Sequence, residues 1–219
     1  MKWSFGNVNV NWLGHDSFAL VGSKTVVIDP FQAGGNYKAD VLLISHEHSD
    51  HLSPEDIKKF VKTETKVFAA KVCEPELSKL NLNVSYLAPG ETATAGGVKV
   101  ETVPAYNLNK FREPGKVFHP AQDGRLGFIV TMDGASFYHA GDTDAIPEMK
   151  TVKVDVALLP VSGTYVMTAD EAAEAAKWIK CRVIVPMHWG TIVGSRADAE
   201  KFKKLVGGRP EVMILAKEA

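Results

Sequence analysis

The sequence of residues 41–51, Val-Leu-Leu-Ile-Ser-His-Glu-His-Ser-Asp-His, joins an apolar run to a cluster of metal-ligating side chains. The apolar run, residues 41–44, predicts a buried strand. Three histidines and one aspartate follow within residues 46–51. Residues 53–56, Ser-Pro-Glu-Asp, then predict the start of a helix, because serine is a good N-cap and proline and acidic residues are favoured in the first turn. The cluster is therefore predicted to be a short loop between a strand and a helix.

The length and charge of the chain limit the classes of protein to which it can belong. Its 219 residues suffice for one domain, residues 1–219, that buries a core without disulfides. A net charge of -1 argues against a nucleic-acid-binding or membrane-surface protein, so a small-molecule substrate is the expected partner, and a homo-oligomer stays open. The two cysteines, Cys73 and Cys181, form no CxxC pair, and no apolar run reaches the ~18 residues of a membrane span. We therefore expect a cytoplasmic protein without a membrane segment.

Short strands and helices alternate along the chain. The expected strands span residues 8–13, 18–21, 25–28, 41–44, 66–70, 126–132, 135–138, 155–159, 182–185 and 212–215, with further short strands within 84–103. The expected helices span residues 54–61, 75–80, 168–178 and 195–205. Residues 105–125 carry no clear period, and we interpret them as a long loop of the kind that covers a functional site.

The last third of the chain repeats the first in outline. The segment at residues 40–44 has a counterpart at residues 155–159, and the helix start at Ser53 has one at Thr168, with the same offset in both pairs. This pattern suggests a duplicated β-α-β-α unit. Two such halves predict an α/β (α+β) fold, a four-layer αββα sandwich in which two mixed sheets pack face to face with helices outside. Side chains at the strand ends would then meet along one edge between the halves.

The side chains expected at this edge suit a metal ion that keeps an open coordination position. His46 and His48 are two residues apart on an extended loop, so both rings can share one metal, and Asp50 and His51 can face a second. Imidazole and carboxylate ligands suit zinc and, with lower affinity, iron or manganese, and the absence of cysteine from the cluster argues against a closed structural zinc site. His188 ends the strand at 182–185, and Asp142 follows Gly141, where its carboxylate could bridge two cations.

Several motifs together resemble the metallo-β-lactamase superfamily of αββα metal-dependent hydrolases. They are HxHxDH at 46–51, Asp29 at a strand end, Gly-Asp-Thr at 141–143 and the strand-terminal His188. Residues 12–15, 138–144 and 186–188 are similar to the branch that holds ascorbate-6-phosphate lactonase and the N-acyl phosphatidylethanolamine phospholipase. The resemblance implies one or two zinc ions, with manganese, iron or nickel as alternatives. It also implies His46 and His48 on the first metal, Asp50, His51 and His188 on the second, Asp142 bridging them, and Asp29 orienting the loop.

One position departs from the family's pattern. The third histidine of the first metal usually stands where this chain has Asn107, whose amide oxygen is a weaker zinc ligand than imidazole. His119 could reach in as a replacement, the first site could bind weakly, or a harder metal could accept the amide oxygen; we favour His119. His139 is expected to be structural, since strand alternation puts it on the opposite face from Asp142. His15 could either pack or hydrogen-bond Asp29 or the ligand loop.

The expected activity is metal-assisted hydrolysis of an ester, lactone or phosphodiester, with Asp50 or Asp142 accepting the proton of the attacking water. Four basic residues of the predicted loop could bind a phosphorylated substrate or could simply be solvated: Lys110, Arg112, Lys116 and Arg125. Two alternatives are a nuclease of the same superfamily, against which the neutral charge argues, and a non-catalytic metal-binding or sensory protein, which Asn107 makes conceivable.

Overall fold

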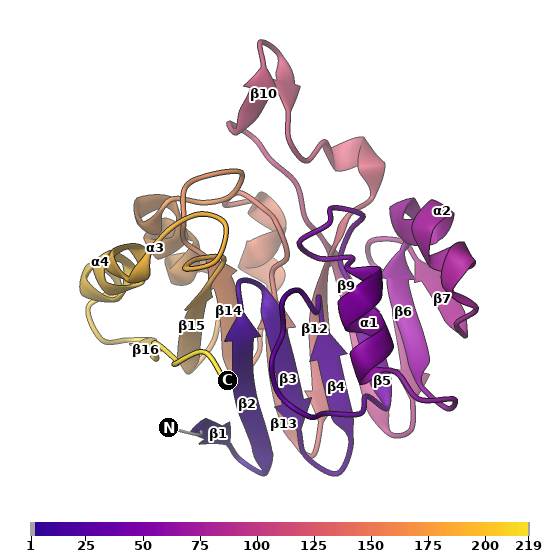
Figure 1. Ribbon diagram of the computed structural model, residues 1–219. Helices are drawn as coiled ribbons and strands as arrows, with labels where there is room; N and C mark the ends of the chain where they lie inside the picture. Colours follow the sequence, from indigo (N-terminus) through magenta and orange to yellow (C-terminus); the bar gives the residue numbers. More distant parts are fainter. Residues whose placement is uncertain (1–2, 219) are drawn as a thin grey trace.

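The computed structural model describes residues 3–218 as two seven-stranded sheets that pack face to face (Figure 1). The first sheet has the order β1 (Trp3–Phe5), β2 (Val8–Gly14), β3 (Ser17–Val21), β4 (Thr25–Ile28), β5 (Val41–Ile44), β6 (Lys66–Ala70) and β7 (Val84–Leu87). The second has the order β16 (Glu211–Val212), β15 (Val183–Met187), β14 (Val156–Pro160), β13 (Ala135–His139), β12 (Leu126–Met132), β9 (Val98–Pro104) and β8 (Thr92–Ala95). The predicted pair of mixed sheets is thus confirmed.

Each sheet is divided into an antiparallel part and a parallel part. Strands β1 to β4 pair antiparallel and β4 to β7 pair parallel. In the second sheet β8, β9, β12 and β13 pair antiparallel, and β13 to β16 pair parallel. The two sheets therefore share one plan, in which β5 and β14 occupy equivalent places. Because parallel strands end at the same edge, the segments that follow β5, β13 and β15 can meet there.

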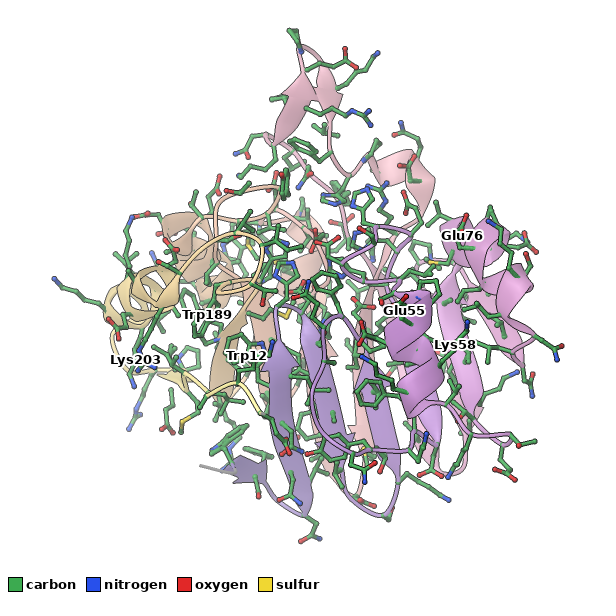
Figure 2. The ribbon with its side chains drawn as sticks, in the orientation of Figure 1. Trp12, Glu55, Lys58, Glu76, Trp189 and Lys203 are labelled. Carbon is green, nitrogen blue, oxygen red and sulfur yellow. The ribbon has the colours of Figure 1, made fainter. Side chains whose placement is uncertain are left out.

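Helices flank the sheets, and their starts follow the sequence signals. They are α1 (Pro54–Phe60), α2 (Glu74–Leu77), α3 (Ala169–Trp178) and α4 (Arg196–Val206), with 3₁₀ helices at Lys71–Cys73, Ser78–Leu80, Ala121–Asp123 and Pro147–Thr151. The Ser53 hydroxyl accepts a hydrogen bond from the backbone N–H of Asp56, and Thr168 and Glu171 form a capping box. Charged residues on the helices face solvent, as Glu55, Lys58, Glu76 and Lys203 illustrate (Figure 2).

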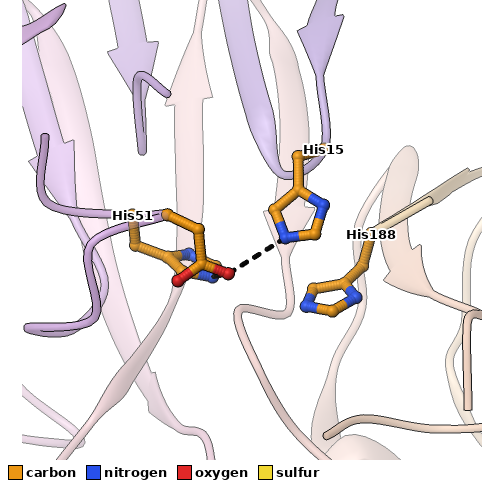
Figure 3. Close-up of side chains that lie close together, drawn as sticks. His15, His51 and His188 are labelled. Atoms are coloured by element: carbon orange, nitrogen blue, oxygen red, sulfur yellow. Dashed lines mark hydrogen bonds and ion pairs between the residues drawn. The ribbon is translucent and has the colours of Figure 1, made fainter. Parts of the chain in front are cut away.

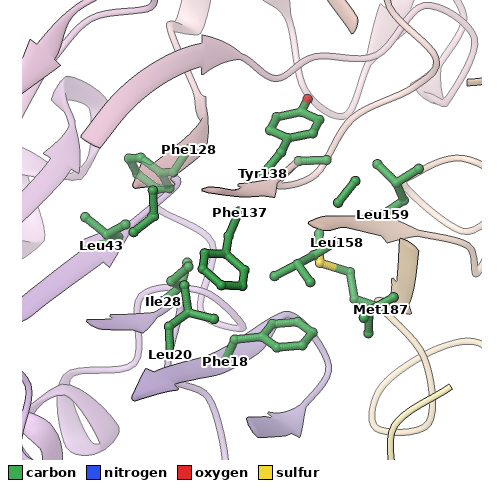
Figure 4. Close-up of a cluster of buried hydrophobic side chains, with 14 of the residues drawn as sticks. Phe18, Leu20, Ile28, Leu43, Phe128, Phe137, Tyr138, Leu158, Leu159 and Met187 are labelled. Atoms are coloured by element: carbon green, nitrogen blue, oxygen red, sulfur yellow. The ribbon is translucent and has the colours of Figure 1, made fainter. Parts of the chain in front are cut away.

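The core lies between the two sheets (Figure 4). Its fully buried side chains include Phe18, Leu20, Ile28 and Leu43 from the first sheet and Phe128, Phe137, Leu158 and Met187 from the second. Burial of each such side chain contributes about 1.5–3 kcal/mol. At one side of this core the rings of Trp12 and Trp189 lie with their centroids 4.4 Å apart (Figure 2). This contact joins β2 to the loop after β15 next to the strand ends.

Several segments differ from the sequence predictions, among them β1, which no pattern in residues 3–5 predicted. The predicted loop at 105–125 contains a hairpin of β10 (Phe111–Glu113) and β11 (Lys116–Val117), which projects from the body of the protein (Figure 1). These strands are too short to produce a recognisable alternation, although Pro114-Gly115 marks their turn. The strand predicted at 212–215 is shorter, because β16 has only an edge position next to β15. Within residues 3–218, none of the helices combines the length and apolar character that crossing a membrane requires.

Candidate metal centre

The loops at one edge of the two sheets bring nine histidine and aspartate side chains together. The turn between β2 and β3 contributes His15 and Asp16, the loop after β5 contributes residues 46–51, and the segment after β13 contributes Asp142. His188 follows β15, and His119 stands between β11 and β12. The backbone N–H of His188 donates to the carbonyl oxygen of His15 at 3.1 Å, so the two halves of the fold are joined within this edge.

Four side chains form what we term the first ligand group: His46, His48, His119 and Asp142. One ligand atom of each lies within 4.8 Å of those of the others. The Asp142 Oδ2 atom is 3.3 Å from His119 Nε2 and 3.9 Å from His46 Nε2. His119 Nε2 is in turn 3.3 Å from His48 Nδ1. All are buried except His48, which is partly exposed, so a ligand could approach the group past that ring.

The second ligand group contains His15, Asp50, His51 and His188, again with ligand atoms within 4.8 Å of one another. His15 Nε2 lies 3.1 Å from Asp50 Oδ2 (Figure 3). Asp142 reaches this group too, with Oδ1 3.2 Å from His51 Nε2 and Oδ2 3.4 Å from His188 Nε2. Asp142 therefore belongs to the first group and also contacts His51 and His188 of the second, the position expected of a bridging carboxylate.

The histidines are held by hydrogen bonds at the ring nitrogen that faces away from the centre. His51 Nδ1 contacts Asp29 Oδ2 at 2.8 Å, His188 Nδ1 contacts Ser162 Oγ at 2.8 Å, and His46 Nδ1 contacts Ser45 Oγ at 3.0 Å. Partners of this kind fix the tautomer and orientation of metal-binding imidazoles. They leave the Nε2 atoms of these three rings free to face the centre.

Backbone strain is concentrated at the same edge. His15, Asp29 and His188 have positive φ values of 52°, 43° and 58°, in the left-handed region that costs a non-glycine residue about 1–3 kcal/mol. Such residues persist only where surrounding contacts hold them, and each has such contacts here. Asp29 accepts a hydrogen bond from the backbone N–H of Ser45 at 2.7 Å and has its own N–H bonded to Leu43. All three of these positions therefore lie beside the side chains of the two ligand groups.

The electrostatic environment differs between the two groups. Burial lowers the pKa of His46 well below its usual value and lowers that of His119 to about 4, so both rings are neutral at neutral pH. Burial also opposes protonation of His188, but the charges of Asp142 and Asp16 outweigh it and raise the pKa to about 9. Burial raises the pKa of Asp50, yet the hydrogen bond with His15 and the nearby His51 lower it to about 2.

The donor atoms of the centre fit a pair of divalent cations. Among residues 3–218, the buried atoms His46 Nε2, His51 Nε2, His188 Nε2 and Asp142 Oδ1 have no hydrogen-bond partner. A buried polar atom without a partner costs about 1–3 kcal/mol, so these four atoms together would carry a heavy penalty unless cations satisfy them. Imidazole nitrogens and carboxylate oxygens are ligands that zinc, manganese and iron accept.

The placement of the other predicted residues follows from this geometry. His119 lies inside the first ligand group, whereas Asn107 lies behind it, with Oδ1 2.8 Å from His119 Nδ1. His139 is outside the ligand groups, with Nε2 2.8 Å from the carbonyl oxygen of Asp16. His15 contacts Asp50 in the ligand loop rather than Asp29. The sequence reasoning did not include Asp16, whose position in a strand-end turn beside His15 was the available signal.

Gly141 places Asp142 at the centre, and no other residue fits there. Its φ is 64°, and a Cβ atom would lie 2.6 Å from the carbonyl oxygen of Leu126. We expect Gly141→Ala to lower the free energy of unfolding by about 2 kcal/mol or more. It should also reduce metal content, because the backbone would have to shift at residue 141 and would displace the neighbouring Asp142. Denaturant titration and metal analysis of the purified protein measure both effects.

Gly134, in the turn between β12 and β13, is the matched control. It also has a positive φ, 77°, but nothing lies within 4 Å of an added Cβ. Gly134→Ala should therefore show only the backbone cost of about 1–2 kcal/mol and normal metal content. Equal effects of the two substitutions would contradict the steric explanation.

Comparisons with known proteins agree with this geometry. A family model described as a β-lactamase superfamily domain matches residues 9–188. A UPF0173 metal-dependent hydrolase from Thermococcus onnurineus is 35% identical over 95% of this chain and 96% of its own. One from Methanoculleus marisnigri is 36% identical over 91% of this chain and 88% of its own. Igni18, a metallo hydrolase from Ignicoccus hospitalis, superposes with a TM-score of 0.78 at 26% identity, covering 97% of this chain and 96% of that one.

Proposed function

Because the chain belongs to the metallo-β-lactamase superfamily, we propose that it is a metal-dependent hydrolase that cleaves an ester or lactone of a small molecule. The observation that carries this proposal is the position of Asp142 between two ligand groups, at the wall of a cavity of about 360 Å³. That arrangement puts metal-binding side chains and a space for a substrate in one place.

We assign the ligands as follows: His46, His48 and His119 hold one cation, Asp50, His51 and His188 hold the other, and Asp142 contacts both. The neutral imidazoles of the first group favour zinc there, and manganese, iron or nickel are alternatives. Asn107 is assigned a positioning role, because its side-chain oxygen already faces the backbone N–H and the Nδ1 atom of His119.

When bound, the metal ions supply an acidified water molecule and a Lewis acid for the scissile carbonyl. Of the two carboxylates considered as proton acceptors, we favour Asp50. It lines the cavity with 18% of its side chain exposed, whereas Asp142 is 3% exposed and surrounded by histidine rings. The low pKa of Asp50, about 2, keeps its carboxylate ionised at neutral pH. His15, with its Nε2 atom 3.1 Å away, fixes the orientation of the carboxylate.

The walls of the cavity favour an uncharged substrate with an apolar group. Phe118, Tyr165 and Ile192 line it next to His48 and Asp50. The Phe118 and Tyr165 rings meet edge to face with centroids 4.7 Å apart, and Ile192 is 51% exposed. An apolar surface of this kind gains free energy by covering an alkyl or aromatic part of a substrate.

Three of the four basic residues of the covering segment form ion pairs with carboxylates, which disfavours a phosphorylated substrate. Lys110 Nζ contacts Glu171 at 2.8 Å and Asp144 at 3.3 Å. Arg125 forms an ion pair with Glu47 and donates to the carbonyl oxygen of Phe118. Arg112 and Lys116 line a separate cavity under the β10–β11 hairpin.

Metal removal combined with a substrate panel tests the proposed function. We expect the purified protein to contain a transition metal and to hydrolyse uncharged esters or lactones, with activity falling to below about a tenth on chelation and returning with added zinc or manganese. The panel also contains phosphodiesters and single-stranded RNA. Cleavage of RNA alone would identify a nuclease, and a metal-loaded protein that turns over nothing would favour a sensor.

We also propose that the protein works in the cytoplasm. Cys73 is buried, Cys181 is half-buried, and both are free thiols. Unpaired cysteines are typical of proteins that work in a reducing environment.

A further inference from the structure

Asp16 is a buried carboxylate without a partner. It lies in the turn between β2 and β3, its exposed fraction is 0%, and within residues 3–218 neither side-chain oxygen has a hydrogen-bond partner. The backbone around it is fixed, because the neighbouring Ser17 donates its hydroxyl hydrogen bond to the carbonyl oxygen of Asp29 at 2.6 Å. On the other side, the carbonyl oxygen of His15 accepts from the indole N–H of Trp12 at 2.8 Å. The turn therefore holds Asp16 in place rather than letting it rotate to water.

The side chain is directed toward the second ligand group. One oxygen of Asp16 and the ligand atoms of His51, Asp142 and His188 all lie within 4.8 Å of one another. Two buried carboxylates, Asp16 and Asp142, thus stand close together, with 0% and 3% of their surface exposed. Like charges at such a separation repel strongly at low dielectric, and only a cation or a shared proton relieves that repulsion.

The geometry points to Asp16 as an additional ligand of the second cation, an assignment that rests on the metal centre of the proposed function. With Asp16 the second position has three carboxylates, Asp16, Asp50 and Asp142, beside the two imidazoles of His51 and His188. The first position has three imidazoles and one carboxylate.

This asymmetry has a consequence for metal choice. Oxygen-rich sites favour manganese and ferrous iron relative to zinc, and imidazole-rich sites favour zinc. A carboxylate added from the buried side also raises the number of available ligands at the second position beyond the four that a tetrahedral zinc ion uses. The preference for zinc over manganese or iron should therefore be smaller at the second position than at the first.

Metal titration of Asp16→Asn tests the inference without relying on activity. The substitution keeps the shape of the side chain and removes its charge. Metal-free wild-type protein should bind two cations, with a smaller preference for Zn²⁺ over Mn²⁺ at the second position than at the first. In Asp16→Asn we expect the affinity for Mn²⁺ to fall by about 10–100-fold, with binding of the first Zn²⁺ unchanged. Calorimetry measures the affinity for each cation, and elemental analysis of the dialysed protein measures how many equivalents of each metal remain bound.

Asp56→Asn is the control for the loss of a buried carboxylate as such. Asp56 lies at the start of α1, outside both ligand groups, and is 5% exposed. Its carboxylate accepts hydrogen bonds from the Ser53 hydroxyl and from the backbone N–H of Gln32. Its substitution should change stability while leaving both metal affinities intact. A folded Asp16→Asn protein with wild-type affinities for both metals would overturn the assignment of Asp16 and leave the proposed function standing.

An anomalous-scattering map of wild-type crystals loaded with Mn²⁺ gives an answer that does not depend on the variant folding. An Asp16 oxygen within about 2.0–2.3 Å of the second cation confirms the inference, and a separation beyond about 3.5 Å refutes it. A wild-type protein that binds no metal at all contradicts the proposed function itself, so the two failures are distinguishable.

Discussion

Asp142→Asn is expected to lower kcat/KM by about a thousandfold or more, equivalent to about 4 kcal/mol of transition-state stabilisation. The Asp142 carboxylate lies 3.2 Å from His51, 3.3 Å from His119 and 3.4 Å from His188. It is therefore in contact with rings of both ligand groups, and its neutral amide replacement would lose the charge that the two proposed cations require. No other side chain of the centre has this double role.

Metal analysis separates this effect from misfolding. Asp142→Asn should retain less than two equivalents of metal after dialysis, while its thermal unfolding remains cooperative. Asp155→Asn is the matched control, because Asp155 accepts hydrogen bonds from the Ser136 N–H at 3.0 Å and hydroxyl at 2.9 Å at the opposite end of β13. That variant should lose stability and keep its metal. Wild-type turnover by Asp142→Asn would show that the reaction does not depend on a shared carboxylate.

Local sequence signals account for the parts of the fold that could be predicted. The apolar run at 41–44 and the Ser53 cap each act within a few residues, so the ligand loop between them could be located without knowledge of the tertiary structure. The repeated pattern at 155–159 predicted the second parallel half for the same reason, and β14 begins at Val156. Signals of this kind need no partner elsewhere in the chain.

The second ligand group could not be completed from sequence, because its contacts join distant turns. His15 meets Asp50 only because β2 and β3 lie in the same sheet as β5, and it meets His188 because the two halves pack together. Asp16 is brought in by the same packing. The β10–β11 hairpin was missed for a different reason, since its strands are three and two residues long and carry no measurable period.

His119→Ala is expected to lower kcat/KM by about a hundredfold and to remove one equivalent of metal. His119 Nε2 lies 3.3 Å from both Asp142 Oδ2 and His48 Nδ1, and burial keeps its ring neutral, with a pKa of about 4. A ring in that state presents a lone pair to the centre. Elemental analysis and kinetics on the same protein preparation give both values, and unchanged metal content and activity would contradict His119 as the replacement for the missing histidine.

The contacts of Asn107 bear on how the first metal site is completed. The sequence left three explanations open: His119 as the replacement ligand, a weakly binding site, or a harder metal that accepts the amide oxygen of Asn107. Its Oδ1 atom faces two donors of His119, the backbone N–H at 3.0 Å and Nδ1 at 2.8 Å, and its amide nitrogen donates to the carbonyl oxygen of Tyr165 at 2.9 Å. An amide oxygen has two lone pairs, so none remains for a cation. If Asn107 acts through His119, Asn107→Ala should lower kcat/KM by about 10–100-fold. The Asn107→Ala/His119→Ala double variant should then have the same kcat/KM as His119→Ala alone.

Additive losses in the double variant would instead mean that the amide oxygen binds metal independently of the imidazole. Asn109→Ala is the control for disturbing the same loop, because the Asn109 amide contacts Glu171 at the surface and faces neither ligand group. Its kinetics and metal content should match those of the wild type. The double-variant comparison thus tests whether His119 completes the first metal site. In that case Asn107, at the position of the family's usual ligand, only holds the His119 ring in place.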